Sequence, residues 1–317
     1  MFSLIKRLQE FLEKLKKNKG LWFTTLTTIA IAGIFVFMYI LLTMTNNVKE
    51  QVYVSIYEDY QKSLNNVLNT KKTSYYSIVQ SLITNDALLN AMERNDKGFL
   101  ANYSQNLNEQ YKRDSLNSII VNFYPFADKE ATLRNTISST LRSKSQISGI
   151  EVQQSGVYVT LIQPVIRNDF FLGLIEIKQS IHSLKDDFEA SDNNFVFLLD
   201  KKMLSKLSLK AKSGRYKDVI NEYIVFQSAY SSRFYTKITD HGEDAFNDDL
   251  KQTYGADDVY FRTYKKAKDI NGADIGLFVI GEGVEKNNGF VNIANSMVNS
   301  VTSVSLGLVI SIILFMF

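Results

Sequence analysis

The sequence is poor in residues on which many enzymes depend. Its 317 residues include no cysteine, one tryptophan, two prolines and two histidines. Without cysteine the chain forms no disulfide, and zinc sites and nucleophilic triads lack side chains that they need. His182 and His241 have no ligand spacing, and we expect His182 to be a partly exposed residue at the start of a helix. The sequence therefore predicts no catalytic residues, no metal site and no cofactor, and a protein that is not an enzyme.

Charged residues are absent from two long stretches, from Gly20 to Val48 and from Asn287 to Phe317. A helix of about 20 consecutive apolar residues spans a bilayer core. We therefore predict transmembrane helices over residues 21–43 and 298–317. The first stretch is longer than the roughly 7–15 apolar residues of a signal peptide, and it has no Ala-x-Ala ending. We expect a retained helix rather than a cleaved leader.

The flanks of the first apolar stretch indicate the orientation. Residues 1–20 contain six basic and two acidic side chains, a net charge of +4, whereas the whole chain has +3. Because basic flanks stay in the cytoplasm, we predict a cytoplasmic segment over 1–20 and a translocated, nearly neutral region over 44–290. The predicted location is the inner (plasma) membrane. The positive charge belongs to this anchor, so we expect no nucleic-acid partner.

The second apolar stretch runs to Phe317 with no basic residue after it. A chain that starts in the cytoplasm and crosses the membrane twice should return there and carry lysine or arginine. We therefore expect a truncated product or a fragment, with a cytoplasmic signalling module after Phe317.

The translocated region begins with a helical pattern. Apolar residues recur every three or four positions from Val48 to Met92 without proline or glycine, which predicts one long helix. β-branched and aromatic residues then favour strands, and Ser155-Gly156 and Arg167-Asn168-Asp169 are turn signals between them. A helix with an antiparallel meander is typical of a PAS-like module. The predicted elements are strands 118–124, 148–153, 157–164 and 170–178, with a short helix at 133–141.

A second, looser set of strands follows, with Asn271-Gly272 as a strong hairpin signal. We predict an α+β fold of two stacked PAS-like modules on one long N-terminal helix, a distal module over about 95–185 and a membrane-proximal one over about 190–285. The acidic run from Asp240 to Asp258 is expected to be a solvated loop rather than a calcium site, because it lacks EF-hand spacing. The predicted elements are strands 194–200, 219–226, 234–238, 259–266 and 275–281, with a helix at 202–210.

One group of motifs resembles a known family. Gly149-Ile150-Glu151 is followed by a strand from Tyr158 to Pro164-Val165, and then by Phe171-Leu172-Gly173 and Glu176. Together with two anchors and two PAS-like modules on a long helix, this pattern resembles the double-Cache sensors. The resemblance implies an extracytoplasmic sensor of a small molecule, attached to a chemotaxis signalling module, a histidine kinase or a cyclic-dinucleotide enzyme. The amino-acid signature of one branch includes a tryptophan, and here Trp22 lies in the anchor.

We predict the ligand site in the distal module, where the strands are clearest. A pocket for a small anionic or polar ligand needs aromatic walls and a fixed guanidinium. The candidate ligand-binding residues are therefore Tyr124, Tyr158, Arg134 and Arg142. A surface or core role is the alternative for each of them, and the proximal module is the alternative location.

The expected function is small-molecule sensing and transmembrane signal relay by a chemoreceptor. One alternative is the input domain of a membrane histidine kinase or diguanylate cyclase, and another is a membrane-tethered scaffold without a ligand. The expected partners are the small-molecule ligand, the membrane and a second copy of the chain in a homodimer.

Overall fold

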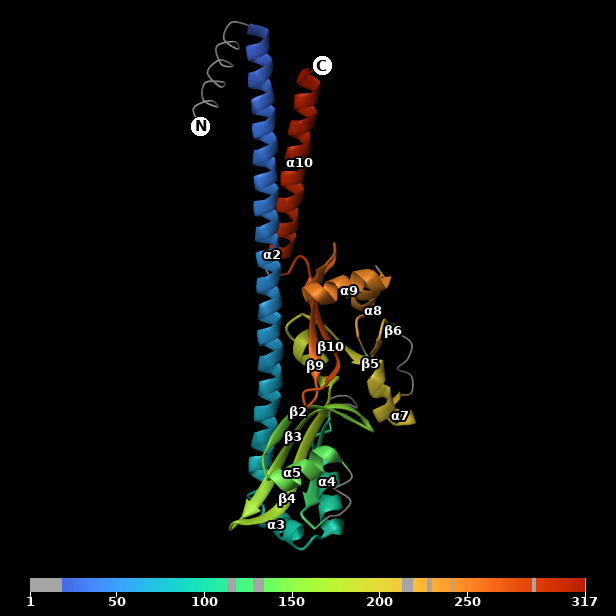
Figure 1. The fold of residues 1–317 in the computed structure, drawn as a ribbon. Helices are drawn as coiled ribbons and strands as arrows, with labels where there is room; N and C mark the ends of the chain where they lie inside the picture. The colour runs from blue at the N-terminus through green and yellow to red at the C-terminus, as the bar shows by residue number, and fades with distance from the viewer. Residues whose placement is uncertain are drawn as a thin grey trace, which may run out of the picture. The chain divides into compact units, whose positions relative to one another are not determined.

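The computed structural model describes residues 19–112, 118–127, 134–212, 219–226, 230–240, 242–286 and 289–316. The chain divides into two compact units, one with Met1–Ser55 and Val284–Phe317 and the other with Ile56–Gly283. Figure 1 shows the long first helix, α2 (Lys19–Leu82), which contributes to both units.

The first unit contains two long apolar helical segments, the first part of α2 and the helix α10 (Phe290–Met316). Both are long and apolar enough to cross a membrane, with windows of mean hydropathy 2.2 and 1.4. Phe35 and Tyr39 of this first segment are exposed. The Tyr53 hydroxyl donates a hydrogen bond to Oδ1 of Asn295 at 2.7 Å, so α2 and α10 contact each other within this unit.

The long helix predicted over 48–92 is two helices, and this correction has a local cause. α2 ends before Asn85, whose side-chain oxygen accepts a hydrogen bond from the backbone N–H three residues later and so begins α3 (Asp86–Glu93). Asparagine is a preferred N-cap because it satisfies an N–H that the helix leaves unpaired. The helix α4 (Lys97–Gln110), which the sequence did not predict, begins in the same way after Asp96.

The first half of the second unit contains a four-stranded antiparallel sheet with the strand order β1-β4-β3-β2. Arg167 pairs with Phe170 across Asn168 and Asp169, which both have positive φ (49° and 67°). Two such residues form the type I′ turn that suits a tight hairpin, so the predicted turn is confirmed. The strands are β1 (Ile119–Pro125), β2 (Ile147–Gln153), β3 (Gly156–Arg167) and β4 (Phe170–Ser180).

The two faces of this sheet differ, because successive side chains point to opposite sides. One face carries the fully buried Val121, Leu161 and Ile177. It also carries Gln179, which accepts a hydrogen bond from the Tyr75 hydroxyl of α2. This face therefore packs against α2. The other face lies under α5 (Asn135–Ser143).

The contact between α5 and its sheet is small. Ile137 and Leu141 of α5 pack with Ile162 and Leu174 in a cluster of four buried residues. Beyond this cluster and the neighbouring Ile147, each strand places polar side chains on the same face.

The second half of this unit contains a six-stranded antiparallel sheet with the order β6-β7-β5-β10-β9-β8. The hairpin predicted at Asn271-Gly272 is confirmed, with Gly272 at φ 84° and the N–H of Asp269 donating to the carbonyl of Ala273. The strands are β5 (Asn194–Asp200), β6 (Val219–Ile220), β7 (Tyr223–Val225), β8 (Tyr254–Ala256), β9 (Tyr260–Lys268) and β10 (Asp274–Gly283).

The strand predicted over 234–238 is wrong, because this range lies in the helix α8 (Ser232–Thr239). The side chain of Ser231 caps the helix by accepting a hydrogen bond from the N–H of Phe234 at 3.2 Å. A short apolar run does not distinguish a strand from a buried helix, and the cap decides here. The other short elements are α6 (Ser183–Glu189), the 3-10 turn η2 (Lys201–Lys206), α7 (Leu209–Lys212) and α9 (Gly242–Gln252).

His182 precedes α6, as predicted, but it is buried rather than partly exposed. Its ring stacks on that of Phe226, with 5.8 Å between the ring centroids. His241 lies outside the described residues.

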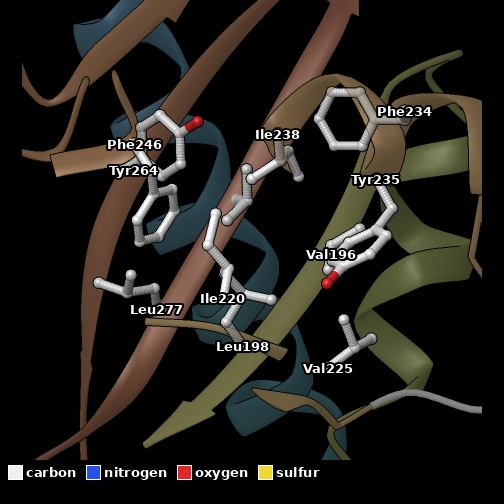
Figure 2. Close-up of a cluster of buried hydrophobic side chains, with 11 residues drawn as sticks. Val196, Leu198, Ile220, Val225, Phe234, Tyr235, Ile238, Phe246, Tyr264 and Leu277 are labelled. Carbon is white, nitrogen blue, oxygen red and sulfur yellow. The ribbon is translucent and has the colours of Figure 1, made fainter. Parts of the chain in front are cut away.

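Apolar side chains cover one face of the six-stranded sheet beneath α8 and α9 (Figure 2). The ring of Phe246 from α9 meets that of Tyr264 from β9 edge-on, with centroids 5.7 Å apart. We call this group the apolar cluster. It contains eleven buried residues: Val196, Leu198, Ile220, Val225, Phe234, Tyr235, Ile238, Phe246, Tyr264, Leu277 and Val279.

Candidate functional site

Every strand of the four-stranded sheet places polar side chains on the face beneath α5. Residues two positions apart in a strand share a face, and the pairings of Asn122 with Glu176 and of Thr160 with Lys178 align these residues across strands. We call this surface the polar face. Its polar residues are Asn122, Tyr124, Glu151, Gln153, Tyr158, Thr160, Glu176 and Lys178.

Glu176 lies at the centre of the polar face and is fully buried. Its Oε1 accepts hydrogen bonds from Nη2 of Arg134 at 2.5 Å and Nε2 of Gln153 at 3.2 Å. Its Oε2 accepts from the Tyr124 hydroxyl at 2.8 Å and from Nδ2 of Asn122 at 3.0 Å. Burial alone would raise the pKa of this carboxyl group, but the guanidinium and the other donors outweigh burial and lower it to about 2. Glu176 is therefore an anion at neutral pH.

Arg134 is the N-cap residue of α5 and joins the two carboxylates of the site. Besides Glu176, its Nη2 contacts Oε2 of Glu151 at 3.0 Å, and its side chain is 26% exposed. Burial lowers the pKa of the guanidinium, but the two carboxylates raise it further, so Arg134 stays charged. Its Nη1 reaches the Tyr124 hydroxyl only at 3.5 Å, and its buried Nε has no hydrogen-bond partner among the residues that the structure describes. The guanidinium thus keeps donor capacity that its protein partners do not use.

Glu151 connects the network to α5 and to a second cation. Its Oε1 accepts a hydrogen bond from the Thr136 hydroxyl at 2.5 Å, and its Oε2 accepts from Nε2 of Gln153 at 2.8 Å. Nζ of Lys178 donates to Oε1 of Gln153 at 2.6 Å and lies 4.8 Å from the centre of the Tyr158 ring. Burial lowers the pKa of Lys178. The network therefore holds two carboxylates and two basic groups, whose charges balance when Lys178 is protonated.

The buried charges of this network are paired within the protein. Charged groups are tolerated inside a protein when they are paired and hydrogen-bonded, and here each carboxylate has such partners. A ligand with an anionic group would find the unused donors of Arg134, and a ligand with a cationic group would compete for Glu151. Among the residues that the structure describes, no group of three or more His, Asp or Glu side chains is arranged to hold a metal ion.

The structure brings together three of the four predicted site residues. Tyr124 and Arg134 bind the same carboxylate, Glu176, and Tyr158 lies under Lys178 on the same face. Arg142 is exposed in the last turn of α5. We therefore leave Arg142 out of the proposed site.

Sequence reasoning did not select the acidic half of the site. Glu151 and Glu176 stand in the Gly-x-Glu and Gly-x-x-Glu motifs, which served only to mark the resemblance. The motif glycine Gly173 has a separate role, because a Cβ there would lie 2.2 Å from the carbonyl oxygen of Tyr124. Glycine at this position allows β1 and β4 to pair closely beside the site.

A second ion-pair network lies in the six-stranded sheet, and it is structural in character. The buried Arg262 contacts the carboxylates of Asp257 and Asp249, and the Tyr264 hydroxyl donates to Asp249 at 3.1 Å. Asp257 also accepts the backbone N–H of Val259 at 2.7 Å. These contacts attach α9 and the turn after β8 to the sheet. The acidic run predicted to be a solvated loop is therefore partly buried and ion-paired.

Comparisons with known proteins found similar folds but no similar sequences. No family model matches the chain, and no curated protein matches it. One similar structure is the extracellular domain of a histidine kinase, vpHK1S-Z8, with 12% identity and a TM-score of 0.44 over 81% of this chain and 99% of that domain. Another is a domain of a sensory box/GGDEF family protein from Vibrio parahaemolyticus, with 11% identity and a TM-score of 0.44 over 77% and 99% of the two chains.

A third similar structure is the ligand-binding domain of the Campylobacter jejuni chemoreceptor Tlp3 in complex with L-valine. It has 12% identity and a TM-score of 0.37, over 77% of this chain and 98% of that domain. The roles proposed below rest on this chain's own residues.

Proposed function

We propose that the chain is the ligand-binding part of a membrane-anchored receptor, and that it binds a small polar molecule with an anionic group on the polar face. The observation that supports this function is the Arg134–Glu176–Glu151 network. Its centre is fully buried, whereas Arg134 is 26% exposed and keeps unused donors. Groups with strongly shifted pKa values and specific charge partners are enriched at functional sites.

Binding at Arg134 explains how a charged ligand could enter a filled network. The ligand's anionic group would bind the exposed part of the guanidinium, and it would weaken the contact with Glu151, which is the longer of the two carboxylate contacts at 3.0 Å. Tyr124 would lie beside the bound group. Signalling then requires that the ligand bind two arrangements of the protein with different affinity. We propose a chemoreceptor as the receptor class, which is one of the three classes that the double-Cache resemblance implies.

The ligand screen is best run on the full chain in lipid nanodiscs. A panel of small carboxylates, amino acids and amines should contain at least one compound that raises the melting temperature, because a ligand that binds only the folded state adds about 2.7 kcal/mol at one hundred times its dissociation constant. Tyr124→Phe should weaken this response and Arg134→Ala should abolish it. Arg142→Ala is the matched control, because Arg142 is an exposed arginine of the same module.

The two site variants guard against different errors. Arg134→Ala leaves two carboxylates without their guanidinium and could unfold the protein, whereas Tyr124→Phe removes one hydroxyl. If both variants fold and keep the full wild-type response, the ligand binds elsewhere, and the six-stranded sheet is the next place to search.

The proposed location of the sensing domain has its own test. Ser191 is exposed just before β5, and the chain has no cysteine, so Ser191→Cys creates a single reactive site. An impermeant thiol reagent should label this cysteine in intact cells, because the basic N-terminal flank predicts translocation of the region that follows the first helix. Labelling only after lysis would place the domain in the cytoplasm and contradict the proposal.

A further inference from the structure

The strand β2 contributes to the polar face and is also attached to the second half of the unit. β2 is an edge strand, so one side of its backbone is free to pair with other segments. The carbonyl of Ile150 accepts a hydrogen bond from the N–H of Ile270 at 2.9 Å, and the carbonyl of Gln154 accepts from the N–H of Ser208 at 2.9 Å. Ile270 lies in the turn of the β9–β10 hairpin, and Ser208 precedes α7.

These two attachments flank the part of β2 that faces the ligand site. Glu151 and Gln153 point into the polar network, where they bind Arg134 and Lys178. The backbone on either side of them is held by the six-stranded part of the unit. A change in the network therefore acts on a short strand that is fixed at two points outside its own sheet.

The motif Gly149-Ile150-Glu151 combines the two kinds of contact in three consecutive residues. A Cβ at Gly149 would lie 3.0 Å from Cγ1 of Ile270, so glycine leaves room for the hairpin turn. Ile150 supplies the backbone acceptor, and Glu151 supplies the carboxylate for Arg134. This explains the motif by packing and hydrogen bonding within this chain.

We propose that β2 couples the polar network to the β9–β10 hairpin, so that ligand binding at Arg134 is read by β10. The proposal rests on the proposed function, because it assumes that Arg134 is the ligand site. An anion on Arg134 would release Glu151. The backbone of β2 would then shift, and the hydrogen bond from the Ile270 N–H to the carbonyl of Ile150 would weaken. β10 ends at Gly283, and the chain continues into α10 from Phe290. The hairpin is therefore the part of the domain that leads directly to the second apolar helix.

Amide hydrogen exchange on the full chain in lipid nanodiscs tests the coupling without a ligand. Glu151→Gln removes the charge that binds Arg134 and keeps the side-chain shape. We expect this change to raise the exchange rate of the Ile270 amide by about tenfold, because local opening is set by the free energy of the contact that protects the amide. Thr160→Val is the matched control. It also removes a polar group from the network, but this group lies on β3, whereas Glu151 lies on β2. The control should change the Ile270 rate by less than about twofold.

Coupling between two sites is reciprocal, which provides a second variant. Gly149→Ala should push the hairpin turn away from β2. It should also raise the exchange rate of the Ser138 amide in the first turn of α5, which donates to the backbone carbonyl of Arg134. If Glu151→Gln does not fold, Glu151→Asp and Gly149→Ala carry the test. Two results together would overturn the coupling. The Ile270 amide would exchange at the same rate in the Glu151 variant and in Thr160→Val, and the Ser138 amide would exchange at the wild-type rate in Gly149→Ala. The ligand screen is independent of this result, so failure of the site and failure of the coupling are distinguishable.

Discussion

The two sheets of the second unit are both covered by short helices, but they have opposite interiors. Beneath α5, the four-stranded sheet presents a charged network of Arg134, Lys178, Glu151 and Glu176, and the adjoining cluster has four buried apolar residues among those described. Beneath α8 and α9, the six-stranded sheet presents eleven buried residues of the apolar cluster. The buried Arg262 of this sheet pairs with Asp249 and Asp257, beside β8.

This difference separates stability from binding. Apolar burial is the main favourable contribution to folding, whereas buried ion pairs often contribute little net stability because desolvation offsets their attraction. The helix-covered face of the six-stranded sheet therefore contributes apolar burial, whereas the polar face of the four-stranded sheet keeps groups that can exchange partners with a ligand. Binding elements are commonly drawn from the less stable parts of a domain. Three changes test this contrast.

The largest expected effect is in the apolar cluster. Phe246 is 1% exposed and packs edge-on against Tyr223 and Tyr264. Phe246→Ala should lower the free energy of unfolding by about 3–5 kcal/mol, because it removes a buried ring and leaves a cavity. Urea unfolding at neutral pH measures this loss. A loss below about 1 kcal/mol would show that the cluster is not the stabilising core.

The second effect is the pH dependence of the polar network. The pKa of Glu176 falls from 4.5 to about 2 on folding, so its contribution is fully present above about pH 4.5 and is lost as the pH falls through 2. By linkage, this group should contribute about 2 kcal/mol less to the free energy of unfolding at pH 3 than at pH 7. Glu176→Gln should remove this part of the pH dependence. Parallel pH profiles for the wild type and Glu176→Gln would contradict the assignment.

The smallest effect compares one hydroxyl in each sheet. Tyr124 donates to Glu176 and Tyr264 donates to Asp249, and burial raises the pKa of both phenols. Each change to phenylalanine should lower the free energy of unfolding by about 1–2 kcal/mol, because a hydrogen bond to a charged acceptor is lost. Only Tyr124→Phe should reduce the thermal response to a ligand. Equal reduction by Tyr264→Phe would remove the functional distinction between the sheets.

Several elements followed from local pattern. The long strands and the turns at Asn168-Asp169 and Asn271-Gly272 were predicted from β-branched runs and turn residues, because both signals act over a few residues. The break after α2 and the helix α8 were missed because each depends on a single cap, Asn85 or Ser231. The spacing of apolar residues continues across such a cap, so the spacing does not reveal where a helix ends or begins.

The sequence pointed to the basic and aromatic residues of the candidate site but not to its carboxylates. Arg134 and Tyr124 were selected because a guanidinium and an aromatic wall suggest a ligand. Glu151 and Glu176 were not, because an acidic residue in a strand gives no sign of its partner. Arg134 lies 42 positions from Glu176 and 17 from Glu151. The pairing of β1 with β4, and of β3 with its two neighbours, brings Tyr124, Glu151 and Glu176 to one face, and the start of α5 places Arg134 beside them.

The sequence by itself determined two uncharged stretches of membrane-spanning length, the α+β character of the region between them and the positions of its main hairpins. These properties follow from composition, period and turn chemistry, which are local. The tertiary structure decided that one sheet face holds a charge-balanced network and the other an apolar cluster. It also decided that the edge strand β2 joins the network to the β9–β10 hairpin, because strand order and helix placement bring together residues that are distant in the chain.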